Sequence, residues 1–139
     1  MMDNVLFFMI PKAQVEFISE DFSVRQALEK MEYHHYSSVP LLSKDGKYIG
    51  ALSDGDLLWY IKERGLNLNN TERVSIMQVE RARDIKAVSI SNEMGNLSTL
   101  ILDQNFVPIV DDLGHFIGIV TRRSVINYLM NEIKEDKKK

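Results

Sequence analysis

The 139-residue sequence contains no cysteine, which excludes disulfide bonds, thiol catalysis and thiolate metal sites and fits a reducing cytoplasm. Basic residues are not in excess: 17 lysines and arginines stand against 20 acidic residues, for a net charge of -3. Nucleic acid is therefore not expected as a partner. Long apolar runs are also missing, because the run at residues 5–10 is too short to cross a bilayer and lacks the flanks of a signal peptide. We expect a cytoplasmic protein without a membrane segment.

The sequence contains an internal repeat. The stretch SVPLLSKDGKYIGALSDGDLLWYI, residues 38–61, is echoed 68 positions later by FVPIVDDLGHFIGIVTRRSVINYL. Upstream of it, FISEDFSVRQAL matches VSISNEMGNLSTL at an offset of 72, which implies a four-residue insertion that is later compensated. Repeats this short usually pair to bury their apolar faces. We expect one domain of two pseudo-symmetric halves, residues 5–65 and 72–133, followed by a solvated charged tail at 134–139.

Each half has the pattern of a β-α-β-β-α unit. The first helix is indicated by an apolar stripe at Val24, Ala27, Leu28 and Met31, and a shorter counterpart begins at Met94. The remaining elements are a leading strand, a hairpin and a closing helix. Leading strands are expected at 15–18 and 85–90, hairpin strands at 37–42 and 47–52 with their counterparts, and closing helices after Ser53 and Thr121. Two three-stranded sheets with helices packed on them make an α+β domain with a cleft between the halves.

The stretch GALSDGD, residues 50–56, allows two interpretations. Ser53 followed by Asp56 is a capping box, which satisfies free N–H groups at the start of the closing helix. The same helix start could bind an anion, because free N–H groups and a hydroxyl face it and glycine permits close approach. A carboxylate one turn later suits ribose hydroxyls rather than phosphate. The functional interpretation is therefore a site for a nucleoside phosphate.

The repeated order of Val-Pro, a turn glycine, Ile-Gly and Ser/Thr resembles the CBS domain, and two copies in tandem resemble a Bateman module. The resemblance covers residues 5–133. It implies an adenine-nucleotide site in the cleft between the repeats, with Ser53 on phosphate and Asp56 on ribose. It also implies residues that border the base: Gln14, Val15, Glu16, Tyr36, Ser37, Ser38 and Pro40. In the second copy Thr121 is present, but Ser124 replaces the ribose aspartate, so we expect one good site rather than two.

Arg122 and Arg123 stand at the first turn of the second closing helix, where cations oppose the helix dipole. They are either a solvated or salt-bridged pair or phosphate ligands, since the guanidinium fork suits phosphate. The TRR stretch, with FMI and YSSVP, is similar to small stand-alone CBS pairs of Gram-positive bacteria that bind cyclic di-AMP. That ligand is therefore included beside AMP, ADP and ATP, although Gln14 and Glu16 depart from the pattern.

The function expected from these residues is regulation rather than catalysis. No catalytic triad, paired carboxylates or metal cluster can be assigned, and no cofactor is expected. A sensor of an adenine nucleotide would pass occupancy to an effector protein, since the repeats use nearly the whole sequence. The resemblance also implies a homodimer through the closing helices. The alternatives are a CBS pair that binds no ligand and serves as a dimerisation scaffold, and a small nucleotide hydrolase.

Overall fold

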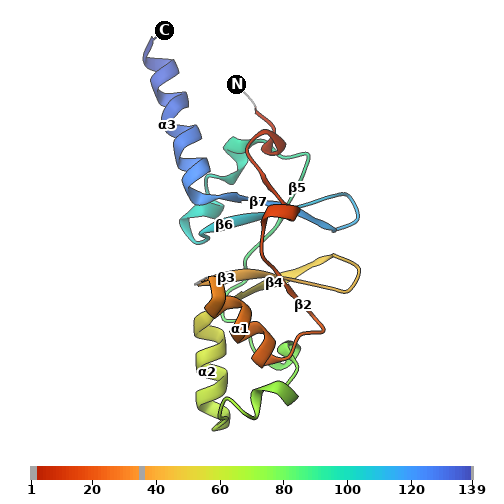
Figure 1. Ribbon diagram of the computed structural model, residues 1–139. Coiled ribbons are helices and arrows are strands. Elements are labelled where there is room, and N and C mark those ends of the chain that lie inside the picture. Colours follow the sequence, from red (N-terminus) through yellow and green to blue (C-terminus); the bar gives the residue numbers. More distant parts are fainter. Residues whose placement is uncertain (1–2, 35–36, 139) are drawn as a thin grey trace. The chain divides into compact units, whose positions relative to one another are not determined.

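The computed structural model describes residues 3–34 and 37–138 of the chain. Two compact units are present: one is Glu16–Asp84, and the other combines Met1–Val15 with Ile85–Lys139 (Figure 1). Each unit has its own sheet and its own apolar core. The α+β class expected from the repeat pattern is confirmed.

The unit Glu16–Asp84 contains a three-stranded sheet in the order β2-β3-β4, with β2 parallel and β4 antiparallel to β3. Its elements are β2 (Ile18–Ser19), α1 (Val24–His34), β3 (Ser38–Leu42), β4 (Tyr48–Ser53) and α2 (Asp54–Arg64). The helices bury one apolar face each against the sheet, through residues such as Ala27 on α1 and Leu57 on α2. The sheet and hairpin match the expectation, although the leading strand is only two residues long.

The second unit contains four strands in the order β1-β7-β6-β5, where three were expected. Its elements are β1 (Ile10–Pro11), β5 (Val88–Ser89), β6 (Phe106–Val110), β7 (Phe116–Thr121) and α3 (Arg122–Lys138). The additional strand, β1, comes from the N-terminal segment and pairs with β7, with Pro11 opposite Gly118. Glycine is required there, because a Cβ at position 118 would overlap the carbonyl oxygen of Ile10.

The two cores are completed by exchanged segments. Val5, at the start of the first half of the sequence, is fully buried in the core of the second unit, and Ile76, near the start of the second half, is fully buried in the core of the first. Backbone hydrogen bonds hold each segment: the Val5 N–H donates to Asn92 O at 3.1 Å, and the Ile76 N–H donates to Phe22 O at 2.9 Å. The packing units therefore differ from the sequence repeats.

The expected offset of 72 between the leading segments was wrong. Ile18 pairs with Leu41 and Val88 pairs with Ile109, so Ile18 and Val88 are equivalent and lie 70 positions apart. Relative to the hairpins, which are offset by 68, the second copy therefore has two extra residues before β5. It has two fewer residues than the first copy between β5 and β6, which restores the offset of 68. This shortening coincides with the absence of an α-helix, because the segment after Glu93 forms two 3₁₀ turns, Met94–Leu97 and Leu100–Leu102.

Residues 134–138, which were expected to form a solvated tail, are helical. α3 continues through Lys138, although its last turns are exposed. Val125 and Tyr128 anchor the first turns of this helix in the core, and the Phe8 ring packs edge-on against Tyr128 at 5.3 Å. The first turns of the helix are therefore packed in the core, and its last turns extend into solvent. Lys137 and Lys138 lie in the last turn, where positive charge stabilises a helix.

Two glycines should respond oppositely to alanine. Gly65 ends α2 in the left-handed region, at φ +62°, whereas Gly95 has open space around it and no positive φ. Gly65→Ala should lower the free energy of unfolding by about 1 kcal/mol, and Gly95→Ala should raise it by about 0.5 kcal/mol through the unfolded state. Urea denaturation of both variants tests this, and a gain in stability for Gly65→Ala would contradict it.

Candidate functional site

The start of α2 is a capping box. The Ser53 Oγ accepts a hydrogen bond from the Asp56 N–H at 3.0 Å, and the Asp56 Oδ2 accepts one from the Ser53 N–H at 3.0 Å. β4 ends at Ser53 and α2 begins at Asp54, and the backbone of Ser53 is extended, as is typical of an N-cap residue. The local interpretation of this stretch is confirmed.

Asp56 has a second contact that the sequence did not indicate. Its other oxygen, Oδ1, accepts a hydrogen bond from the Ala82 N–H at 3.0 Å. Asp56 is only 8% exposed, and both of its carboxylate oxygens accept hydrogen bonds from backbone N–H groups of the same unit. Asp56 therefore ties residues 80–84, which lead into the second repeat, to the start of α2.

Three serine residues gather beside this cap. Ser38 lies opposite Ser53 in the β3-β4 register, and the Ser37 carbonyl accepts a hydrogen bond from the Asp54 N–H at 2.9 Å. Ser37 is exposed and Ser38 half-buried. The first N–H groups of α2 all have partners, because the Gly55 N–H donates to the Asp54 Oδ1 at 2.7 Å beside the bonds of Asp54 and Asp56. Pro40 is buried in the middle of β3, and Tyr36 lies outside the described residues.

The N-terminal candidates divide between the units. Gln14 and Val15 belong to the second unit, where Gln14 is exposed at the end of the 3₁₀ turn Lys12–Gln14. Glu16 begins the first unit, forms an ion pair with Lys30 at 3.2 Å, and lies 3.6 Å from the His34 Nε2. The Lys30 charge offsets the negative charge that a carboxylate would otherwise present to phosphate.

The second cap resembles the first in its backbone but not in its side chains. The Thr121 Oγ1 accepts from the Ser124 N–H at 3.1 Å, and the Arg122 N–H donates to Asn105 O at 2.8 Å. Serine at position 124 has no carboxylate with which to hold a second backbone segment. The second copy is thus a simpler cap.

The two arginines of that cap have different surroundings. The Arg122 Nε donates to Ile101 O at 2.8 Å and to Gln104 O at 3.1 Å, so it caps the carbonyls that end the 3₁₀ segment. Arg123, in contrast, is exposed at the surface. The sequence-based prediction gave both arginines the same role. In the structure Arg122 stabilises the fold through its hydrogen bonds, and Arg123 is accessible to solvent.

Arg81 is a residue near the first cap that the sequence prediction missed. Its side chain crosses Gly50 on β4, where an added Cβ would lie 2.9 Å from Nε. Burial raises the pKa of the nearby Tyr48 phenol well above its usual range; Asp84 raises it further and Arg81 lowers it. No repeat signal could have revealed Arg81, because the residue 68 positions earlier is Ala13.

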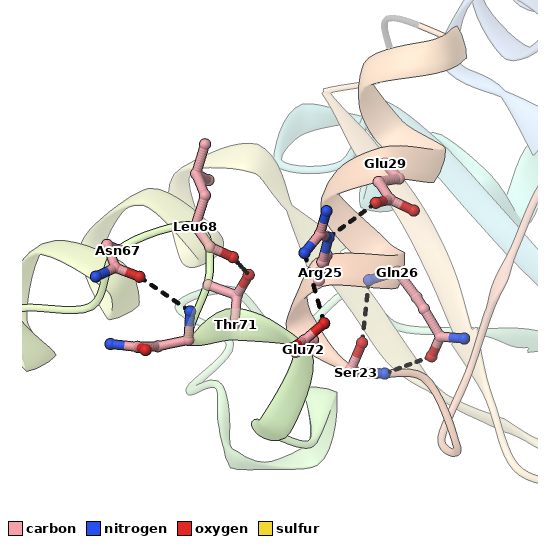
Figure 2. Close-up of polar contacts among 9 residues, drawn as sticks. Ser23, Arg25, Gln26, Glu29, Asn67, Leu68, Thr71 and Glu72 are labelled. Carbon is pink, nitrogen blue, oxygen red and sulfur yellow. Dashed lines mark hydrogen bonds and ion pairs between the residues drawn. The ribbon is translucent and has the colours of Figure 1, made fainter.

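A surface groove of about 680 Å³ lies at the N-terminus of α1, away from the predicted contacts. It is lined by Asp21, Phe22, Ser23, Arg25, Gln26, Glu29, Glu72, Arg73, Val74 and Ser75. Arg25 forms ion pairs with Glu29 at 3.0 Å and with Glu72 at 3.5 Å, so these three charged side chains of the groove pair with one another (Figure 2). Of the predicted binding residues that the structure describes, none lines this groove.

Metal clusters and membrane-spanning helices are both missing from residues 3–34 and 37–138. No group of three or more histidine, aspartate or glutamate side chains is placed to hold a metal ion in these ranges. Of the helices described there, none combines the length and apolar character that a bilayer crossing requires.

Comparison with known proteins identifies both repeats. The model of the CBS domain matches residues 8–63 and 82–131. An uncharacterized protein of Methanopyrus kandleri is 30% identical over 115 residues, which are 79% of this chain and 57% of that protein. The chain thus spans little more than half the length of this relative.

Solved structures share the fold. The CbpB protein of Listeria monocytogenes, determined in complex with c-di-AMP, has a TM-score of 0.80 and 25% identity, covering 94% of this chain and 97% of that one. CBSX2 of Arabidopsis thaliana, determined in complex with AMP, has a TM-score of 0.68 and 24% identity, covering 95% of this chain and 98% of that one.

Proposed function

Because the chain belongs to the CBS-domain family as a tandem pair, we propose that it is a cytoplasmic regulatory module that binds an adenine nucleotide and signals to an effector protein. The observation that carries this proposal is the serine-rich cap of α2. Ser53 caps the helix, Ser38 lies opposite Ser53 in the β3-β4 register, and the Ser37 carbonyl accepts the Asp54 N–H, so three hydroxyl-bearing residues lie at a helix N-terminus, the end that favours an anionic group. The role is that of a sensor, without cofactor or catalysis.

The choice of ligand draws on the relatives. CbpB of Listeria binds cyclic di-AMP and CBSX2 binds AMP, so both are included with ADP and ATP. In the proposed complex Ser53 contacts phosphate and Asp56 the ribose. Since both Asp56 oxygens already accept backbone N–H groups, the ribose would use their remaining lone pairs. Gln14, Val15, Tyr36 and Ser38 are proposed to border the base, and Arg123 is proposed as a further phosphate contact.

We also propose a homodimer through the closing helices. Ile126, Met130 and Ile133 form a stripe of apolar side chains on α3 that are each about half exposed, at 45%, 51% and 50%. Leu58 and Trp59 are similarly exposed on α2. Apolar side chains exposed along a helix in this way are typical of an interface between copies.

A second candidate function is a ligand-free dimerisation scaffold. One specific observation favours it: Ser53 and Asp56 already hydrogen-bond with backbone groups of the cap and of Ala82, as residues with a structural role alone would. A panel of AMP, ADP, ATP and cyclic di-AMP, with cyclic di-GMP as control, separates the two functions. A sensor should be stabilised by about 2.7 kcal/mol at a ligand concentration 100 times Kd, visible as a raised Tm. A scaffold should show no change with any nucleotide.

A matched pair of cap variants tests where the ligand binds. Ser23 caps α1 as Ser53 caps α2: its Oγ accepts from the Gln26 N–H at 3.1 Å and its N–H donates to Gln26 at 2.8 Å (Figure 2). Ser53→Ala and Ser23→Ala should each lose about 1 kcal/mol of stability. Only Ser53→Ala should weaken nucleotide binding in calorimetry. Equal affinities for the two variants would remove Ser53 from the site.

A further inference from the structure

Residues 80–84 end the first unit and lead to Ile85, where the chain enters the second. They contain no helix or strand, and all of them except the half-buried Arg81 are exposed. In the part of the chain that the structure describes, these residues form a single hydrogen bond, from the Ala82 N–H to the Asp56 Oδ1 at 3.0 Å. Beside the packing of Arg81 on Gly50, this bond is what attaches the segment to the first unit.

The acceptor of this bond is the carboxylate that the capping box holds through its other oxygen. The Asp56 Oδ2 accepts from the Ser53 N–H at 3.0 Å, and the Oδ1 accepts from the Ala82 N–H. A carboxylate held through one oxygen alone can still turn, because the terminal torsion of an aspartate side chain is broad. Bonds to both oxygens fix its plane. The Ala82 N–H therefore sets an orientation that the capping box by itself leaves open.

The fixed carboxylate offers two acceptor sites side by side. Each carboxylate oxygen carries two lone pairs, so each oxygen of Asp56 keeps one after its backbone bond. Two adjacent acceptors suit two adjacent hydroxyl donors, which is the chemistry of a ribose diol. Ser124, at the corresponding position of the second copy, has a single hydroxyl and cannot offer this pair.

We propose that the Ala82 N–H positions the Asp56 carboxylate for the ribose, and that nucleotide binding in turn holds residues 80–84 at the start of α2. This inference rests on the proposed function. The two states are the Ala82–Asp56 bond formed and broken, and the nucleotide binds the formed state more tightly. By linkage, the factor that this bond adds to nucleotide affinity is the factor by which bound nucleotide strengthens the bond. The segment that leads into the second unit therefore responds to occupancy of the site.

Calorimetry on four proteins tests the inference, with whichever of AMP, ADP, ATP and cyclic di-AMP binds the wild type most tightly and with its 2′-deoxy form. Beside the wild type, Ala82→Pro lacks the N–H donor and Ala82→Gly keeps it. Asp84→Pro is the control for proline itself, because the exposed Asp84 donates its N–H to none of the described residues.

The wild type should bind the ribonucleotide more tightly than the 2′-deoxy form. Ala82→Pro should weaken the ribonucleotide roughly 10-fold, a factor typical of coupling between two sites, and bring its affinity close to that of the 2′-deoxy form. Ala82→Gly and Asp84→Pro should keep the wild-type ratio of the two affinities. Equal weakening of both forms by Ala82→Pro would mean that Ala82 acts on the fold alone, which would overturn the inference and leave the proposed function standing.

Hydrogen exchange of the wild type checks the reciprocal effect and decides the matter if Ala82→Pro fails to fold. Among residues 81–84, the Ala82 amide should exchange most slowly, and saturating ribonucleotide should slow it roughly 10-fold further, with less effect from the 2′-deoxy form. Unchanged or faster exchange would show that the ribose does not reinforce the bond and would overturn the inference. Absence of binding by the wild type with all four nucleotides would overturn the proposed function together with this inference.

Discussion

Ile76→Ala should lower the free energy of unfolding by about 2–5 kcal/mol, the range for truncating a fully buried aliphatic side chain. Ile76 belongs to the second half of the sequence, residues 72–133, but is buried in the core of the first unit. The neighbouring Met77 is 43% exposed and outside both cores, so Met77→Ala is a matched control expected to lose less than about 1 kcal/mol. Urea denaturation measures both.

Hydrogen exchange locates the effect of Ile76→Ala. Amides of β3 and β4 should lose protection before those of β6 and β7, because the cavity opens in the first unit. If β6 and β7 were affected first, the segment would pack with its own repeat and the exchanged arrangement would be wrong.

Gln104→Leu should cost on the order of 3 kcal/mol, because it leaves one buried and two part-buried backbone groups without this partner. The Gln104 side chain is 4% exposed. Its Oε1 accepts from the Lys86 N–H at 2.8 Å, and its Nε2 donates to Lys86 O and to Phe106 O, each at 3.1 Å. This amide joins the segment before β5 to the start of β6.

The control for Gln104→Leu is Gln78→Leu, since Gln78 is exposed and its side chain accepts a long hydrogen bond from the Tyr60 hydroxyl at 3.3 Å. Gln78→Leu should change stability by less than about 0.5 kcal/mol. Equal losses in the two variants would mean that the buried amide contributes no more than a surface one.

Much of the fold could be predicted from local pattern. The hairpins were located because each pairs two β-rich segments across a short turn, such as Ser43–Lys47 closed by the Ser43 N–H to Lys47 O bond at 2.8 Å. The capping box at Ser53 was located because its partners are three residues apart. The α-helix predicted to begin at Met94 was wrong. Met94, Leu97 and Ile101 are buried as their spacing suggested, but Gly95 and a shorter connection to β6 favour 3₁₀ turns over an α-helix.

The candidate site was predicted in part for a similar reason. Ser37, Ser38, Ser53 and Asp56 come together through the hairpin register, which repeats in the sequence. The roles of Arg122 and Arg123 could not be separated, because the carbonyls that Arg122 caps lie about 20 residues away, at Ile101 and Gln104.

Local pattern was sufficient for the repeat, for most of the order of elements in each half and for the caps of the closing helices, since these depend on residues close together in the chain. Three features became visible only in the folded chain: Val5 and Ile76 are each buried in the core of the other half, Asp56 accepts a hydrogen bond from Ala82 across 26 positions, and the Arg81 side chain lies on Gly50. The physical reason is that contacts between residues far apart in the chain depend on how well the side chains fit and how much apolar surface they bury, and local sequence pattern records neither. A residue such as Ile76 packs wherever an apolar site is left open, whichever repeat supplies it.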